Sequence, residues 1–101
     1  MRMHLLVASL VAATTPLAGA QNPDPNFARN IAAACANCHG TNGVSKGGIP
    51  SLAGQSKSEL VRKMQDYKSG RTPATIMPQL AKGYSDQEID RMAGWFAAQK
   101  P

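Results

Sequence analysis

Apolar residues recur at helical spacing in three stretches of the chain, and no stretch alternates with the period of a β-strand. The clearest helix follows Ser85 and Glu88, whose types and spacing form a capping box. Its apolar positions are Ile89, Met92, Ala93, Phe96 and Ala97. Because they repeat as i, i+3, i+4, i+7 and i+8, they predict one buried helix face.

The first predicted helix begins at Phe27, where Asn26 is expected to cap it, and runs into Cys35. Its apolar face carries Phe27, Ile31 and Ala34. Gly40 is expected to end the helix, and residues 40–54 then form a loop with five glycines and one proline. A loop of this length is unusual in so small a domain unless it wraps something.

The middle helix is predicted to begin after Ser56, whose spacing to Glu59 forms another capping box. Its apolar face carries Leu60, Met64 and Tyr67. Gly70 is expected to end it, and residues 71–83, which contain two prolines and no clear period, are predicted to be irregular. The predicted fold is therefore all-α, with three main helices and long connections.

The first 20 residues are predicted to be a secretory signal peptide. A positively charged start precedes an apolar run from Leu5 to Ala13, and Ala18-Gly19-Ala20 matches a small-residue cleavage site. The run is shorter than the roughly 20 apolar residues that span a bilayer, and a retained N-terminal anchor is the alternative. We expect residues 1–20 to be removed, leaving a single periplasmic domain, residues 21–101, with no membrane span.

The exported chain offers little material for a hydrophobic core. It has 81 residues, five aromatic side chains and a formal charge of +4. Domains of this size often need a disulfide, a metal or another staple. The length excludes a large enzyme, and the positive charge forms no Lys/Arg run that would favour nucleic acid. Such a charge suits solubility or docking to an acidic partner.

The segment from Cys35 to His39 reads C-x-x-C-H, the signature of covalent haem attachment. Two thiols one helical turn apart can each add to one vinyl group of haem, and the adjacent His39 can bind the iron. A zinc site, a dithiol redox centre and a structural disulfide are the alternatives. Zinc requires four ligands, a dithiol centre favours a βαβ context, and a disulfide leaves His39 unexplained. The motif predicts one haem c, bound covalently by Cys35 and Cys38.

Met77 is the candidate for the second axial ligand of the iron. Met64 and Met92 fall on apolar helix faces, where methionine usually fills core space. Met77 precedes Pro78, whose ring stiffens the chain, although a methionine tucked beneath a loop is the alternative. Ligation by histidine and methionine raises the reduction potential and closes the iron to substrate, which favours electron transfer over catalysis.

Four other residues are candidates for supporting contacts with the haem. Pro50 can offer its carbonyl oxygen to the free ring nitrogen of His39, or it merely bends the loop. Tyr67 and Arg71 lie near enough to the predicted ligand in sequence to reach the haem propionates. Lys82 is placed similarly, although ordinary solvent exposure explains it equally well.

Four segments together resemble the class I c-type cytochromes: C-A-N-C-H-G, I-P-S-L-A-G, I-M-P and the capped C-terminal helix. The resemblance covers nearly all of residues 26–100. It implies a class I cytochrome c fold, with crossed first and last helices and long loops around one covalently attached haem. It also implies that His39 and Met77 are the axial ligands and that Pro50 accepts a hydrogen bond from His39.

A narrower resemblance is to the haem-subunit family of flavocytochrome c sulfide dehydrogenases. It rests on four short segments: 68–70, 74–77, 81–85 and 92–94. It implies a periplasmic heterodimer in which an FAD-containing flavoprotein oxidises sulfide and the haem subunit takes the electrons one at a time. Well-known members of that family carry two haem domains, whereas this sequence contains one C-x-x-C-H and resembles the first domain.

The leading hypothesis is therefore an electron-transfer haem subunit that is not an enzyme by itself. It is expected to pass electrons to a soluble acceptor such as another cytochrome. A free-standing periplasmic cytochrome c shuttle is the alternative. A third hypothesis, a catalytic haem protein such as a peroxidase, requires an open coordination site at the iron.

Overall fold

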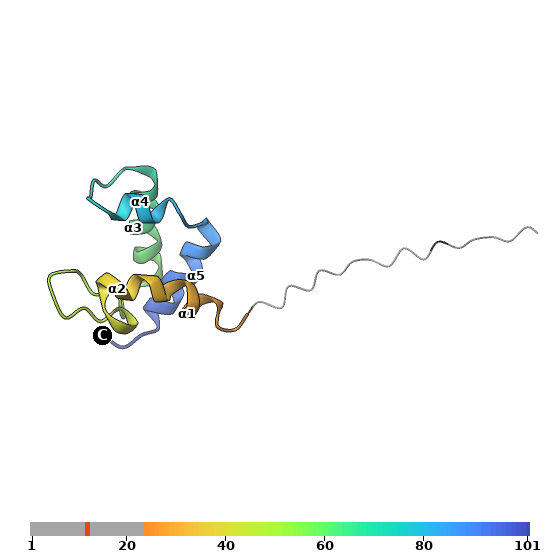
Figure 1. Cartoon of the computed structure of the whole chain (residues 1–101), viewed down its shortest axis with the longest axis horizontal. Helices are drawn as coiled ribbons and strands as arrows, with labels where there is room; N and C mark the ends of the chain where they lie inside the picture. The colour runs from red at the N-terminus through yellow and green to blue at the C-terminus, as the bar shows by residue number, and fades with distance from the viewer. Residues whose placement is uncertain (1–11, 13–23) are drawn as a thin grey trace, which may run out of the picture.

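The computed structural model describes residue 12 and residues 24–101, and the predicted signal peptide lies outside the described residues except for Ala12. The described part of the chain is helical and contains no β-strand, as the sequence predicted (Figure 1). No helix within it combines the length and the apolar character needed to cross a membrane. The helices are α1 (Phe27–Ala32), α2 (Ala36–His39), α3 (Lys57–Ser69), α4 (Met77–Ala81) and α5 (Asp86–Ala97).

The first predicted helix is present but is divided by the 3₁₀ turn Ala33–Cys35, which separates α1 from α2. The predicted cap is wrong, because the Asn26 side chain makes no capping hydrogen bond. Asp24 acts instead: its carboxylate accepts from the Asn26 N–H at 2.8 Å, and its carbonyl accepts from the Phe27 N–H at 2.9 Å. The core position is Ala32, which is 1% exposed.

The predicted start of α3 is confirmed at Ser56, whose hydroxyl accepts from the Glu59 N–H at 3.3 Å. The reciprocal half of that capping box is missing because the Glu59 carboxylate pairs with Arg62 at 2.8 Å. The box that opens α5 is complete between Ser85 and Glu88. Its two reciprocal hydrogen bonds fix the point at which α5 begins.

The prediction that residues 71–83 are irregular is wrong in part, because α4 lies within them. Pro78 stands in the first turn of α4, where its missing N–H has no intrahelical partner to lose. Proline is favoured at this position because its fixed φ angle already suits the first turn of a helix. Met77 is therefore the first residue of a short helix.

The apolar stripe of α5 forms the centre of the core, as predicted. Ile89 is fully buried, and Met92, Ala93 and Phe96 are 4%, 3% and 3% exposed. Burying each large member contributes about 1.5–3 kcal/mol. Helix α1 packs across α5, and α3 packs against both α4 and α5 (Figure 1). The contact of the first and last helices agrees with the crossed arrangement that the resemblance implied.

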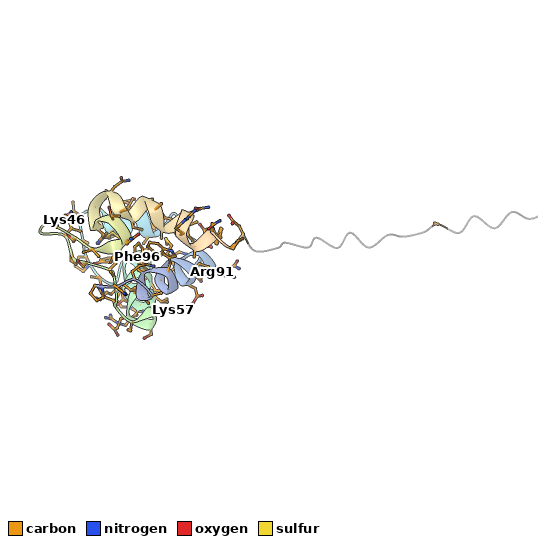
Figure 2. The ribbon with its side chains drawn as sticks, turned by 90° about the horizontal axis from the view of Figure 1, so that it is seen from below. Lys46, Lys57, Arg91 and Phe96 are labelled. Carbon is orange, nitrogen blue, oxygen red and sulfur yellow. The ribbon has the colours of Figure 1, made fainter. Side chains whose placement is uncertain are left out.

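Basic side chains lie on several sides of this core. Figure 2 shows Phe96 inside the folded part, with Lys46, Lys57 and Arg91 on different sides of it. Lys57 forms an exposed ion pair with Asp90 at 3.0 Å, which links the start of α3 to α5. Exposed pairs of this kind contribute little to stability.

Candidate functional site

A large cavity, of about 390 Å³, lies between the helices. Its walls come from α2, α3, α4, α5 and the loop before α3, and they are mostly apolar. A cavity of this size with a few polar groups in its walls is typical of a site for a small molecule or cofactor. It also brings together residues that are distant in the sequence.

Cys35 and Cys38 both line this cavity, and neither is joined in a disulfide. Burial raises the pKa of the Cys35 thiol, which keeps that sulfur neutral beside the apolar wall. Among the described residues, no three His, Cys, Asp or Glu side chains are grouped as a metal site. The absence of strands in residues 24–101 also removes the βαβ context of a dithiol redox centre.

His39 is the last residue of α2 and lines the same cavity. Its Nδ1 donates a hydrogen bond to the Pro50 carbonyl oxygen at a distance of 2.6 Å. This bond fixes the ring and leaves Nε2 as the nitrogen that can bind a metal. Gly40 turns the chain directly afterwards with a φ of +87°, and a Cβ there would collide with the Val44 carbonyl oxygen. The loop can therefore return Pro50 to His39 only with glycine at this turn.

Met77 lines the cavity from α4, whereas His39 lines it from α2. Figure 1 shows these two helices well apart, with α4 at the top of the view and α2 lower down. Met64 and Met92 also line the cavity, but Met92 belongs to the buried core. Met77 differs from both because it begins a helix on a separate segment of chain.

The predicted supporting residues fall into two groups. Tyr67 and Pro50 both line the cavity. Arg71 and Lys82 are exposed and are not among the lining residues. The Arg71 guanidinium instead meets the Asp66 carboxylate at 3.3 Å. The structure thus brings Tyr67 to the site but not Arg71.

Lys63 also lines the cavity, although the sequence patterns did not identify it as a candidate site residue. It stands three residues after Leu60 and four before Tyr67, so it shares their helix face. That spacing was a usable signal for a cation at the cavity wall. Tyr84 is a second lining residue that was not among the sequence candidates. Burial raises the pKa of its phenol, and the nearby Cys35 adds to this increase.

The apolar side chains at the edge of the cavity fit a flat hydrophobic group such as haem. Ile49, Ile76 and Leu80 line the cavity and are 46%, 57% and 48% exposed. Leaving several large apolar side chains exposed around one opening is unfavourable unless a ligand or partner covers them. The buried hydrophobic residues of the described chain include four alanines, so protein side chains alone fill little of this interior. The residues present therefore fit haem, with two thiols, a histidine and a methionine in the same walls.

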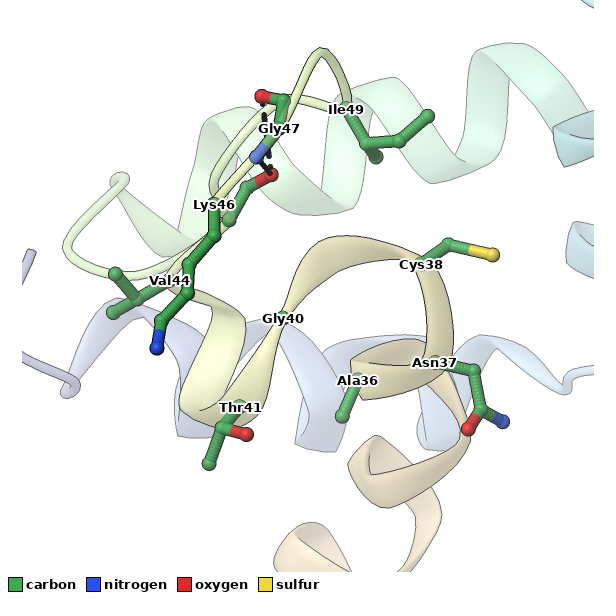
Figure 3. A pocket seen from close by; sticks show the side chains of 10 residues that line it. Ala36, Asn37, Cys38, Gly40, Thr41, Val44, Lys46, Gly47 and Ile49 are labelled. Atoms are coloured by element: carbon green, nitrogen blue, oxygen red, sulfur yellow. Dashed lines mark hydrogen bonds between the residues drawn. The ribbon is translucent and has the colours of Figure 1, made fainter.

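A smaller hollow, of about 280 Å³, lies between α2 and the loop that follows it (Figure 3). Cys38 contributes to this hollow too, but Figure 3 shows its side chain directed away from Val44 and Lys46. Its lining residues are mainly small or polar, among them Asn37, Thr41 and Ser45. The Cys38 thiol is therefore assigned to the larger cavity.

Two thiols, a histidine and a methionine around one apolar cavity in an all-helical chain are the features of a c-type cytochrome domain. A family model described as "Cytochrome C oxidase, cbb3-type, subunit III" matches residues 23–96. The chain therefore belongs to this family of cytochrome c domains. The predicted class I cytochrome c fold is confirmed.

Known proteins that are similar in sequence to this chain are also named as cytochromes. The chain is 39% identical over 66 residues to the cytochrome subunit of sulfide dehydrogenase of Chlorobaculum tepidum, covering 65% of this chain and 60% of that protein. It is 40% identical over 70 residues to cytochrome c4 of Pseudomonas aeruginosa, covering 68% of this chain and 35% of that protein. It is 34% identical over 70 residues to cytochrome c-554(548) of Halomonas halodenitrificans, covering 65% and 84%. The chain thus spans less than two thirds of the first two proteins.

Proposed function

We propose that residues 21–101 form a periplasmic electron carrier with one haem c attached through Cys35 and Cys38, with His39 and Met77 as the axial ligands. The observation that carries this proposal is the shared cavity, because all four side chains line it. The apolar edge of the cavity supports it, since haem would cover those side chains. Removal of residues 1–20 as a signal peptide is part of the same proposal.

We assign a separate role to each of the protein side chains and carbonyl groups that would hold haem in this site. The Pro50 carbonyl oxygen accepts a hydrogen bond from the Nδ1–H of His39, which orients the ring and increases the basicity of Nε2. Lys63 and Tyr67 provide a cation and a hydroxyl in the cavity wall, which suits contact with carboxylate groups. When bound, haem c supplies an iron that gains and loses one electron, at a potential that histidine and methionine ligation raises.

Occupation of both axial positions by protein side chains disfavours catalysis by the isolated chain. A peroxidase requires an open position at the iron, and Met77 on α4 would close it. We therefore propose electron transfer as the activity and assign no catalytic residue. Electrons would enter or leave where Ile76 and Leu80 form the exposed edge of the cavity.

We further propose that the electron donor is a flavoprotein that oxidises sulfide and that the acceptor is a soluble protein such as another cytochrome. The similarity to a cytochrome subunit of sulfide dehydrogenase supports this partner. A free-standing electron shuttle is the second candidate. The similarity to cytochrome c4 and cytochrome c-554(548), whose names contain no dehydrogenase, favours it.

Purification from the native source under mild conditions tests the partner. We expect haem and flavin to elute together in a constant ratio, and we expect sulfide to reduce the haem in that fraction. The matched control is the same haem protein after separation from the flavoprotein, which sulfide should reduce much more slowly. A haem protein that elutes alone and without flavin would support the shuttle and overturn the subunit proposal.

A further inference from the structure

The carboxyl end of α3 makes polar contacts with both ends of the Met77 segment, defined as residues 71–84. At the first end, Asp66 is only 8% exposed. Its carbonyl oxygen accepts hydrogen bonds from the N–H groups of Arg71 at 2.8 Å and Thr72 at 3.2 Å. Its carboxylate meets the Arg71 guanidinium at 3.3 Å. Asp66 therefore holds the start of the segment through both its main chain and its side chain.

At the second end, Lys68 reaches the last residue of the segment. Its ammonium group donates to the Tyr84 carbonyl oxygen at 2.7 Å and meets the Asp86 carboxylate at 3.2 Å. The Gln65 amide donates to the same carboxylate at 2.9 Å. The hydrogen bond from Gln65, followed by the contact with Lys68, holds the pKa of Asp86 below its ordinary value. The end of α3 thus anchors the start of α5 and the residue that precedes its cap.

Apolar burial holds the middle of the Met77 segment weakly. Helix α4 has five residues, which is too short to be stable by itself. Ala81 is completely buried, but Ile76 and Leu80 are 57% and 48% exposed and face the cavity opening. The polar contacts at the two ends therefore add to the packing of α4 against α3 in fixing where α4 lies.

From this arrangement we infer that Asp66 and Lys68 are positioning residues that hold Met77 in place for iron ligation; this inference rests on the proposed function. A ligand must be held within about 0.5 Å of its working position, and residues behind it normally supply that precision. The Asp66 carboxylate is also paired with Arg62 at 3.0 Å, but Arg62 keeps its pair with Glu59, so removing the Asp66 charge chiefly frees the Arg71 guanidinium. The segment should then detach from the iron more often while the rest of the fold persists.

The test compares Asp66→Asn with Asp90→Asn in the full haem-loaded protein. Asp90 is the control because its carboxylate makes an ion pair of 3.0 Å with Lys57, the first residue of α3, which lies outside the Met77 segment. The measurements are the rate of carbon monoxide binding to the ferrous protein and the absorption band of ferric iron bound to methionine sulfur. Carbon monoxide binds only when Met77 has left, so its rate reports detachment and not overall stability.

We expect Asp66→Asn to increase the carbon monoxide binding rate about tenfold, the factor that corresponds to one lost charge-assisted hydrogen bond. It should also weaken the sulfur band, whereas Asp90→Asn should change neither quantity. If Asp66→Asn fails to fold, Lys68→Met removes the contacts at the other end and should give the same increase. Equal rates in the wild type and in the folded variants would overturn the inference.

Met77→Ala, measured beside them, separates this inference from the proposed function. If Met77→Ala binds carbon monoxide at the wild-type rate, Met77 is not the ligand and the proposed function fails. If Met77→Ala binds it much faster while Asp66→Asn and Lys68→Met do not, Met77 is the ligand and only the positioning roles are overturned.

Discussion

Met77→Ala is expected to lower the reduction potential of the haem protein by on the order of 100 mV or more, within the range of about 0.8 V that axial ligands span. The physical reason is that a thioether stabilises ferrous iron, and water or an empty position does not replace it. The sulfur absorption band of the ferric protein should disappear as well. A redox titration with absorption spectra measures both effects.

Met64→Leu is the matched control for this prediction. Met64 lines the same cavity from α3, so its replacement changes a sulfur atom near the site while keeping the volume similar. The Met64→Leu protein should keep the reduction potential and the sulfur absorption band of the wild type. An unchanged spectrum and potential in Met77→Ala would contradict the assignment and would favour the catalytic alternative with an open iron.

The second large effect is expected when the haem cannot attach. A variant carrying Cys35→Ala and Cys38→Ala should lack haem and should lose essentially all of the roughly 5–15 kcal/mol of stability that folded domains usually have. The cavity of about 390 Å³ would then expose its apolar walls to water, and the small buried core could not compensate. Circular dichroism during heating should show low helix content and no cooperative transition.

The haem-loaded wild type, heated under the same conditions, is the reference for that measurement. It should retain its helices and melt cooperatively, because the attached haem fills the cavity, and its contacts with the cavity walls and with His39 and Met77 form only in the folded state. Native-like helicity with a sharp melting transition in the haem-free variant would show that the chain folds without haem. Haem would then not be the group that compensates for the small protein core.

The strongest periodic features of the sequence translated directly into structure. The α5 stripe from Ile89 to Phe96 is buried as its spacing required, and the box formed by Ser85 and Glu88 starts that helix. The C-x-x-C-H motif placed two thiols and His39 beside one cavity. These features depend on local spacing, which the sequence shows without knowledge of tertiary contacts.

The errors arose where tertiary or competing local contacts decide the outcome. Pro78 was interpreted as a mark of irregular chain, but it stands in the first turn of α4. Asn26 has the right residue type for a cap, yet Asp24 makes the bonds. The Arg71 guanidinium pairs with buried Asp66 and does not line the cavity, which charge pattern alone does not reveal, and its contact with the haem propionates stays a prediction.

The mass of the intact protein, after export by its native source, tests the central claim most directly. We predict that the exported protein carries the added mass of one haem, retained under denaturing conditions because Cys35 and Cys38 bind it covalently. Peptide mapping should locate the added mass on the peptide that contains both cysteines. A mass without haem, or haem that denaturation releases, would contradict covalent attachment and with it the proposed electron carrier.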